Sequence, residues 1–154
     1  MKQRIYIDTS VIGGCEDSEF SKWSKQLFHE FQRGLRIAVI SDLTRRELET
    51  APEEVKEVLP AIPHGSLEDV FLTEEAEALA HNYIQDRVVT TKHVLDAQHI
   101  AIASVERVDV LVSWNFQQIV NLNRIRGFNA VNLKLGYPVL EIRSPREVLY
   151  EKEI

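Results

Sequence analysis

The sequence predicts an α/β fold with a mainly parallel central sheet, because short apolar runs of strand length alternate with helical segments of roughly a dozen residues. The run at 37–40, Ile-Ala-Val-Ile, is apolar without interruption, which is typical of a strand covered on both faces. In sheets of this kind the ligand site lies beyond the carboxyl ends of the strands. The polar residues that directly follow each strand are therefore the first candidates for function.

The first third of the chain contains two expected strands. Residues 5–7 form the first, which ends at Asp8, and Gly13-Gly14 lies beyond it in a loop or loosened turn. Gly34 ends an expected helix whose apolar residues recur at helical spacing, namely Phe20, Trp23, Leu27, Phe28 and Phe31. After the second strand at 37–40, Ser41 or Asp42 caps a helix that carries Leu43, Glu47 and Leu48.

Two longer helices are expected in the middle of the chain. They follow a short helix that starts at Pro52 and a turn bracketed by Pro60 and Pro63. Thr73 caps the first long helix, in whose first turn the helix dipole favours Glu74 and Glu75. The apolar stripes of the two helices are Ala76, Leu79, Ala80, Tyr83 and Ile84, then Ala97, Ile100, Ala101, Ser104 and Val105.

The last third contains three expected strands and a final helix. Residues 108–112 form a buried strand, and 128–133 and 139–142 are expected as two more. Ser144-Pro145-Arg146-Glu147 has the spacing of a capping box, which starts a short helix. Because no repeat, low-complexity tract or long linker interrupts the pattern, we expect one domain over residues 1–154.

Composition excludes several classes of protein. A single cysteine, Cys15, cannot form an internal disulfide, so a disulfide-stapled secreted scaffold is excluded. The longest stretch without a charged residue, 110–123, is interrupted by polar residues, among them Ser113, Asn115, Gln117, Gln118 and Asn121, so no membrane span is expected. The N-terminus has no apolar signal core, and a soluble cytoplasmic protein is expected. A net charge of −6 argues against a protein that coats duplex nucleic acid, although not against an enzyme that holds a phosphodiester through metal ions.

Four polar positions carry the candidate chemistry: Asp8, Glu47, Asp96 and Asn115. Each has a simpler interpretation when taken alone. Asp8 and Asp96 can be helix-terminal carboxylates, and Glu47 can be a solvated helix residue. Their shared position at strand–helix transitions makes the set informative.

These segments, taken in order, resemble the PIN domain family of metal-dependent nucleases, particularly its VapC-type toxin branch. The resemblance rests on the segments at 5–10 (IYIDTS), 41–48, 96–103 (DAQHIAIA) and 111–115 (LVSWN), and it runs through nearly the whole chain. It implies a three-layer α/β/α fold, an acidic cluster that binds Mg²⁺ or Mn²⁺, and hydrolysis of phosphodiester bonds, usually in RNA. It also implies a small antitoxin protein as a partner, and family members are often homodimers.

The resemblance assigns roles to the candidate residues. Asp8, Glu47 and Asp96 are the implied metal ligands, and hard cations such as Mg²⁺ do prefer oxygen donors. Ser10, or Thr9, is expected to orient a ligand or touch the scissile phosphate. Asn115 stands where many members of the family have a fourth acid, so a second metal site is expected to be weaker. The alternative function is a catalytically weakened PIN-fold module that binds RNA or another protein.

Other candidates have weaker support. The five histidines lack the spacing of a zinc site. His99 can reach the cleft rim or pack in the core, and Trp114 can stack on a base or pack in the core. Cys15 has no obvious histidine partner. A phosphoaspartyl enzyme is disfavoured, because Ser10 stands where such enzymes usually have a second aspartate. Basic residues near the motifs can contact RNA or be solvated: Arg45, Arg46, Lys92, Arg124 and Arg126.

Overall fold

The computed structural model describes residues 1–151 and contains a five-stranded sheet that is parallel throughout. The strands lie in the order β3-β2-β1-β4-β5. Their bounds are β1 Arg4–Ile7, β2 Ile37–Ser41, β3 Leu67–Val70, β4 Val110–Val112 and β5 Ile142–Arg143. The chain therefore builds outward from β1 in one direction and then returns to add β4 and β5 on the other side. The reversal lies between β1 and β4.

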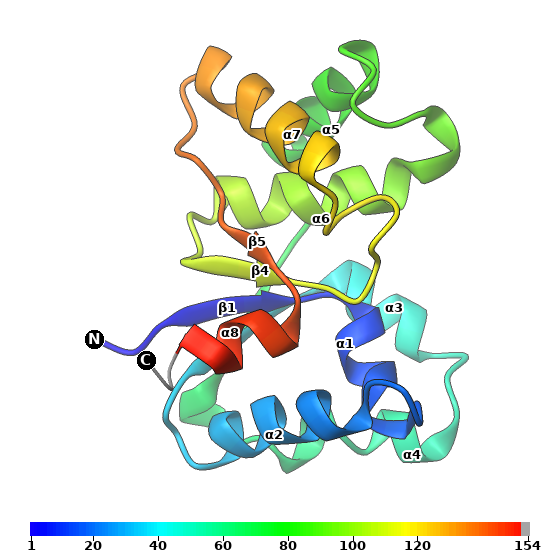
Figure 1. The fold of residues 1–154 in the computed structure, drawn as a ribbon, viewed down its shortest axis with the longest axis vertical. Helices are drawn as coiled ribbons and strands as arrows, with labels where there is room; N and C mark the ends of the chain where they lie inside the picture. Colours follow the sequence, from blue (N-terminus) through cyan, green and yellow to red (C-terminus); the bar gives the residue numbers. More distant parts are fainter. Residues whose placement is uncertain (152–154) are drawn as a thin grey trace.

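Helices cover both faces of the sheet and complete three layers (Figure 1). One layer contains α5 (Glu74–Gln85), α6 (Val94–Val105) and α7 (Leu122–Lys134). The opposite side carries α1 (Thr9–Gly13), α2 (Ser21–Gln32), α4 (Glu53–Lys56) and α8 (Pro145–Glu151), with α3 (Asp42–Leu48) after β2. Single 3-10 turns join these elements: η1 Gly14–Glu16, η2 Leu59–Ala61, η3 His64–Ser66 and η4 Thr91–His93.

Alternate residues of the strands point into two separate cores. Tyr6, Val39 and Leu111 pack with α5, α6 and α7. Their neighbours on β1, β2 and β4 pack on the other side with α1 and α2: Ile5, Ile7, Ala38, Ile40, Val110 and Val112. Both faces of the central strands are thus buried, which explains why the strand sequences are uniformly apolar rather than alternating.

Most of the expected elements are confirmed. The strands predicted at 5–7, 37–40 and 108–112 correspond to β1, β2 and β4, and the long helices to α2, α5 and α6. Thr73 caps α5 through its side chain. The capping box at α8 is closed in both directions, because Ser144 N donates to Glu147 Oε1 and Glu147 N donates to Ser144 Oγ. The last three residues of the domain predicted over 1–154 lie outside the described residues.

Three expectations were wrong. Residues 128–133, expected as a strand, lie in α7, where Phe128, Val131 and Asn132 form a buried face at helical spacing. The strand expected at 139–142 is shorter and lies later in the chain, because β5 contains only Ile142 and Arg143. The loop expected around Gly13-Gly14 is instead the helix α1 followed by η1. The edge strand β3 was not predicted, because Glu68 and Asp69 interrupt its apolar pattern.

Candidate active site

The predicted site residues converge where the strand order reverses. Asp8 directly follows β1, and Ser113 and Asn115 follow the neighbouring strand β4. Glu47 lies on α3, which follows β2 on the other side of β1, and Asp96 lies in the first turn of α6. The expectation that polar residues after the strands meet at one edge is confirmed, and this edge is where parallel sheets bind ligands.

Asp8 is the buried centre of the site. It is 5% exposed, and its carboxylate accepts hydrogen bonds from the hydroxyls of Ser10 and Ser113, each at 2.6 Å. It also caps α1 by accepting from Val11 N at 3.3 Å. Burial raises the pKa of Asp8, and the charge of His99 and the two serine hydrogen bonds oppose that rise. Asp8 can therefore cap α1 and belong to the candidate site at the same time.

Glu47 is oriented by His99 from α6. His99 Nε2 lies 3.0 Å from Glu47 Oε1, and this hydrogen bond lowers the pKa of Glu47. On its other side, His99 Nδ1 lies 2.6 Å from the Tyr6 hydroxyl, which also contacts Ser41 Oγ at 2.8 Å. Tyr6, Ser41 and His99 are all buried. His99 is thus both packed in the core and joined to the candidate site.

Asp96 and Asn115 form the third part of the site. Asn115 Nδ2 donates to Asp96 Oδ1 at 3.4 Å, and Asn115 Oδ1 accepts from the backbone N–H groups of Gln117 and Gln118. Because two backbone donors fix the orientation of the amide, its nitrogen faces Asp96. Asn115 therefore presents a donor to the acidic cluster, whereas the aspartate of the family pattern would present a fourth negative charge.

The three carboxylates share one electrostatic environment. Burial raises the pKa of Asp96, and the charges of Asp8 and Glu47 raise it further, against the opposing charges of His99 and His93. In the part of the chain that the structure describes, no three His, Cys, Asp or Glu side chains are grouped closely enough to hold a metal ion as they stand. Each carboxylate is instead satisfied by hydroxyl, imidazole or amide partners. The donor set is nevertheless all oxygen, which fits Mg²⁺ or Mn²⁺.

The hydroxyls beside Asp8 are placed differently from one another. Ser10 Oγ donates to Asp8 and accepts from Trp114 N at 3.0 Å, so it links α1 to the segment after β4. Thr9 Oγ1 is buried and makes no well-formed hydrogen bond among the described residues, although it lies near enough to Glu47 to help lower the pKa of that carboxyl. Ser113 belongs to the polar residues after the strands that were expected at this edge, but its contact with Asp8 was not predicted. Tyr6 was not singled out from the sequence. Both reach the site through the pairing of β1 with β4 and β2.

Most of the remaining candidate residues are buried or bonded to other parts of the protein. Trp114 is buried, and its Nε1 donates to Ser24 Oγ at 2.9 Å. Arg45 pairs with Asp69 at 2.7 Å, and Arg124 donates to the carbonyl of Val88. Burial raises the pKa of the Cys15 thiol to about 11, which disfavours a thiolate nucleophile. The exposed basic residues Arg46, Lys92 and Arg126 are free to meet solvent.

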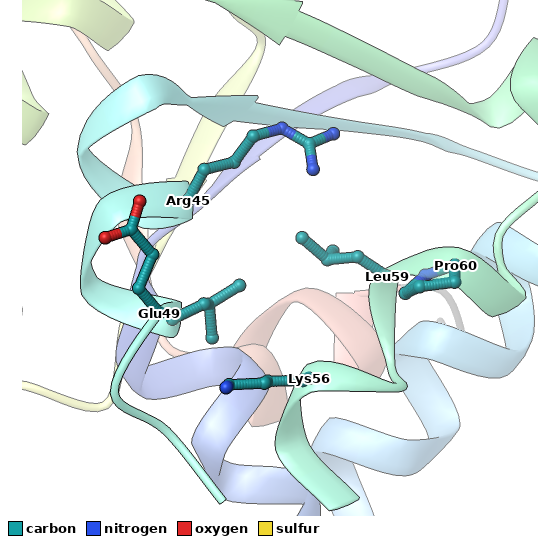
Figure 2. A pocket seen from close by; sticks show the side chains of 6 residues that line it. Arg45, Glu49, Lys56, Leu59 and Pro60 are labelled. Carbon is teal, nitrogen blue, oxygen red and sulfur yellow. The ribbon is translucent and has the colours of Figure 1, made fainter. Parts of the chain in front are cut away.

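A hollow of about 380 Å³ lies beside α3 (Figure 2). It is lined by Arg45 of α3 and by Glu49, the residue after α3, and by Leu59 and Pro60 of η2 and Lys56 of α4. None of Asp8, Glu47, Asp96 and Asn115 lines this hollow. Its walls hold none of the carboxylates on which the candidate chemistry depends, so it is distinct from the candidate active site.

Comparison with solved structures identifies proteins that share this architecture. No family model and no curated protein matches the sequence. Similar structures include VapC20 of Mycobacterium tuberculosis, a Sarcin-Ricin loop cleaving toxin, at 11% identity and a TM-score of 0.56, over 72% of this chain and 89% of that one. VapBC2 of Rickettsia felis, bound to a DNA fragment from its promoter, has 12% identity and a TM-score of 0.56, over 92% and 98% of the two chains. The chain has a VapC-type PIN-domain fold.

A third structure similar to this PIN domain is FitAcB of Neisseria gonorrhoeae, at 16% identity and a TM-score of 0.53, over 92% of this chain and 97% of that one. Identities this low establish the fold of the PIN domain and leave its chemistry to its own residues. Within residues 1–151 of the PIN domain, no helix is long and apolar enough to cross a bilayer.

Proposed function

We propose that this PIN domain is a Mg²⁺- or Mn²⁺-dependent endoribonuclease that hydrolyses RNA phosphodiester bonds. The observation that carries the proposal is the convergence of Asp8, Glu47 and Asp96, from three different elements, at the switch point of the sheet. Neighbouring carboxylates repel one another, as the raised pKa of Asp96 beside Asp8 and Glu47 indicates, and a divalent cation relieves that repulsion. The similarity to VapC20, a toxin that cleaves an RNA loop, supports the same activity.

The chain's own residues would position the reaction. A bound ion polarises the phosphoryl oxygen, lowers the pKa of a water and stabilises the leaving oxygen. Asp8 would bind the ion with its orientation fixed by Ser10 and Ser113, and Glu47 with its orientation fixed by His99. Asp96 would complete the ligand set, while the Asn115 amide limits the negative charge around it. Ser10, or Thr9, would contact a phosphate oxygen.

The first test is a Mn²⁺ titration by calorimetry, because it needs no knowledge of the RNA target. Wild type is expected to bind Mn²⁺ saturably, and Asp8→Asn and Glu47→Gln are expected to lose that binding. Glu57→Gln, at an exposed position after α4, is the matched control and should bind as wild type does. Binding that survives both site substitutions would contradict the shared metal site.

The second test is cleavage of single-stranded RNA in Mn²⁺ against the same reaction in EDTA. Cleavage that depends on the metal, on Asp8 and on Glu47 supports the endoribonuclease. Asn115 and the net charge of −6 favour the alternative, a catalytically weakened module. RNA binding without metal-dependent cleavage would favour that alternative.

We further propose that the domain acts in the cytoplasm as the toxin of a type II toxin–antitoxin pair, with a small antitoxin protein as its partner and a homodimer as its assembly. The similarity to VapBC2, which was solved on promoter DNA, supports a partner of this kind. The expected result is growth arrest on expression, relieved by co-expression of a short protein encoded directly upstream. Growth arrest that persists in Asp8→Asn would show that the toxicity does not depend on this site.

A further inference from the structure

Four aromatic side chains gather beside the acidic site, and we call them the aromatic cluster: Phe20, Trp23, Trp114 and Phe116. Phe20 stacks on Trp114 with a centroid distance of 4.2 Å and an interplanar angle of 13°. Phe116 meets Trp114 edge-on at 6.1 Å and lies 6.3 Å from Phe20. Trp23 lies 6.3 Å from Trp114 on the other side. The cluster joins the start of α2 to the segment that follows β4.

The rings of the cluster differ in their access to solvent. Trp114 is 8% exposed and its indole N–H is satisfied by Ser24, so it supports the cluster from within. Phe116 is 48% exposed, an unusual fraction for so large an apolar side chain. Its T-shaped contact with Trp114 holds the ring against the protein. Phe116 therefore offers a solvent-accessible aromatic surface on a buried support.

Phe116 is also tied to the candidate catalytic residues. It directly follows Asn115, whose side chain donates to Asp96 and accepts from the backbone of the next turn. Trp114 N donates to Ser10 Oγ, and Ser10 in turn contacts Asp8. The backbone on the N-terminal side of Phe116 is thus fixed by hydrogen bonds to two sides of the acidic site. We therefore expect the base next to a phosphodiester held by that site to lie near this segment.

We propose that Phe116 is a stacking platform for a nucleobase of single-stranded RNA bound at the acidic site, and that it determines a preference for unpaired substrate. This inference rests on the proposed ribonuclease function. Stacking on an aromatic side chain needs a base whose faces are free, and bases in a duplex are already stacked on one another. A duplex of the same sequence cannot use the ring.

The charges around the aromatic cluster suit such a strand. Lys22 Nζ lies 5.8 Å and Arg146 Cζ 5.0 Å from the centroid of the Trp23 ring. Both side chains belong to exposed residues. Aromatic rings together with cations are the features with which proteins bind single strands. Lys22 and Arg146 provide positive charge at the aromatic cluster in a domain that is acidic as a whole.

The test compares Phe116→Ala, Phe116→Leu and Phe116→Tyr with Phe71→Ala. Phe71, after β3, is 62% exposed and outside the aromatic cluster, so it controls for loss of an exposed phenylalanine. The probes are a fluorescent oligoadenylate of about 12 nucleotides and its duplex with oligouridylate. Binding is measured by anisotropy in Ca²⁺, a cation with looser geometry than Mg²⁺, and cleavage is measured separately in Mn²⁺. Thermal melting confirms that each variant is folded.

The expected result is that Phe116→Ala and Phe116→Leu weaken single-strand binding by about tenfold, while duplex binding changes by less than about twofold. Phe116→Tyr should keep wild-type binding because it keeps the aromatic face, and Phe71→Ala should match wild type. The inference would be overturned if Phe116→Ala and Phe71→Ala changed single-strand binding equally, or if Phe116→Ala weakened duplex binding as much as single-strand binding. It would also be overturned if the wild-type protein did not bind the single strand. Metal-dependent cleavage with an unchanged KM in Phe116→Ala would overturn the stacking role and leave the ribonuclease standing. Single-strand binding that depends on Phe116, in a protein that does not cleave RNA, would support the stacking role and overturn the ribonuclease.

Discussion

At the scale of single residues, Asn115 distinguishes this site from one with four acids. Its amide gives the acidic cluster a hydrogen-bond donor at Asp96, and its oxygen holds the backbone of Gln117 and Gln118. A carboxylate at the same position would keep the two backbone bonds. It would replace the donor with a negative charge next to Asp96. The amide therefore favours the metal-free form of the site over the metal-bound form.

Asn115→Asp tests this balance. We expect Mn²⁺ affinity to rise by about tenfold, since an added carboxylate oxygen strengthens a cation site by about 1.4 kcal/mol or more. We expect the metal-free protein to lose about 1–2 kcal/mol of stability from the lost hydrogen bond and the like-charge contact. Calorimetry and thermal melting in EDTA measure the two effects. Asn123→Asp adds the same charge at an exposed position in the first turn of α7 and should change neither by more than a few tenths of a kcal/mol.

The residues of the site were predictable only where they adjoin a strand or a helix start. Asp8 and Asn115 follow strands and Asp96 lies in the first turn of α6, whereas Glu47 lies near the end of α3 and was identified only through the family resemblance. The partners that orient them were not predictable in the same way. Ser113 reaches Asp8, and Tyr6 reaches His99, across sequence separations of 105 and 93 residues. Such contacts depend on which strands pair, and the hydrophobic pattern does not specify the order of parallel strands.

At the scale of elements, the same limits apply to the strands and helices. The fully apolar strands β1 and β2 and the strongly periodic helices α5 and α6 were predicted because burial dictates their composition. The edge strand β3 was missed because two of its side chains form ion pairs instead, Glu68 with Arg4 and Asp69 with Arg45. Helix α7 was mistaken for a strand because Gly127 interrupts its pattern. A Cβ at that glycine would lie 2.8 Å from Val88 Cγ1, so close packing, and not a turn, explains it.

Gly14, like Gly127, permits close packing, in this case between α1, α2 and the aromatic cluster. A Cβ there would lie 2.5 Å from Ser24 Oγ and 2.7 Å from Trp114 Nε1, two atoms that are hydrogen-bonded to each other. We expect Gly14→Ala to destabilise the domain by about 1–3 kcal/mol, because the methyl group must displace that pair. At about 2–4 °C for each kcal/mol, the melting temperature should fall by several degrees, with a change in tryptophan fluorescence.

Gly13→Ala is the matched control. Gly13 has φ −61° and ψ −29°, and a Cβ there would meet nothing within 4 Å. The substitution should therefore leave the domain unchanged or stabilise it by up to about 1 kcal/mol. Equal melting temperatures for the two variants would show that Ser24 and Trp114 can move apart at little cost.

At the scale of the whole molecule, the negative charge of Asp96 favours folding only when it is compensated. The sheet brings Asp8, Glu47 and Asp96 together, so folding itself creates the repulsion between them. Burial and that repulsion both raise the pKa of Asp96, which means that its ionised form is less favourable in the folded protein than in the unfolded chain. A bound cation reverses this effect. Metal affinity and folding stability are therefore coupled through one side chain.

The substitution Asp96→Asn separates metal affinity from folding stability. The substitution removes a charge but keeps the size of the side chain, so we expect the metal-free protein to melt at a higher temperature than wild type in EDTA. In wild type, Mn²⁺ at about 100 times its Kd should add about 2.7 kcal/mol, or roughly 5–10 °C. In Asp96→Asn this increment should disappear. A lower melting temperature of the variant in EDTA would show instead that Asp96 acts mainly as an N-terminal carboxylate of α6, where its negative charge stabilises the helix through the dipole.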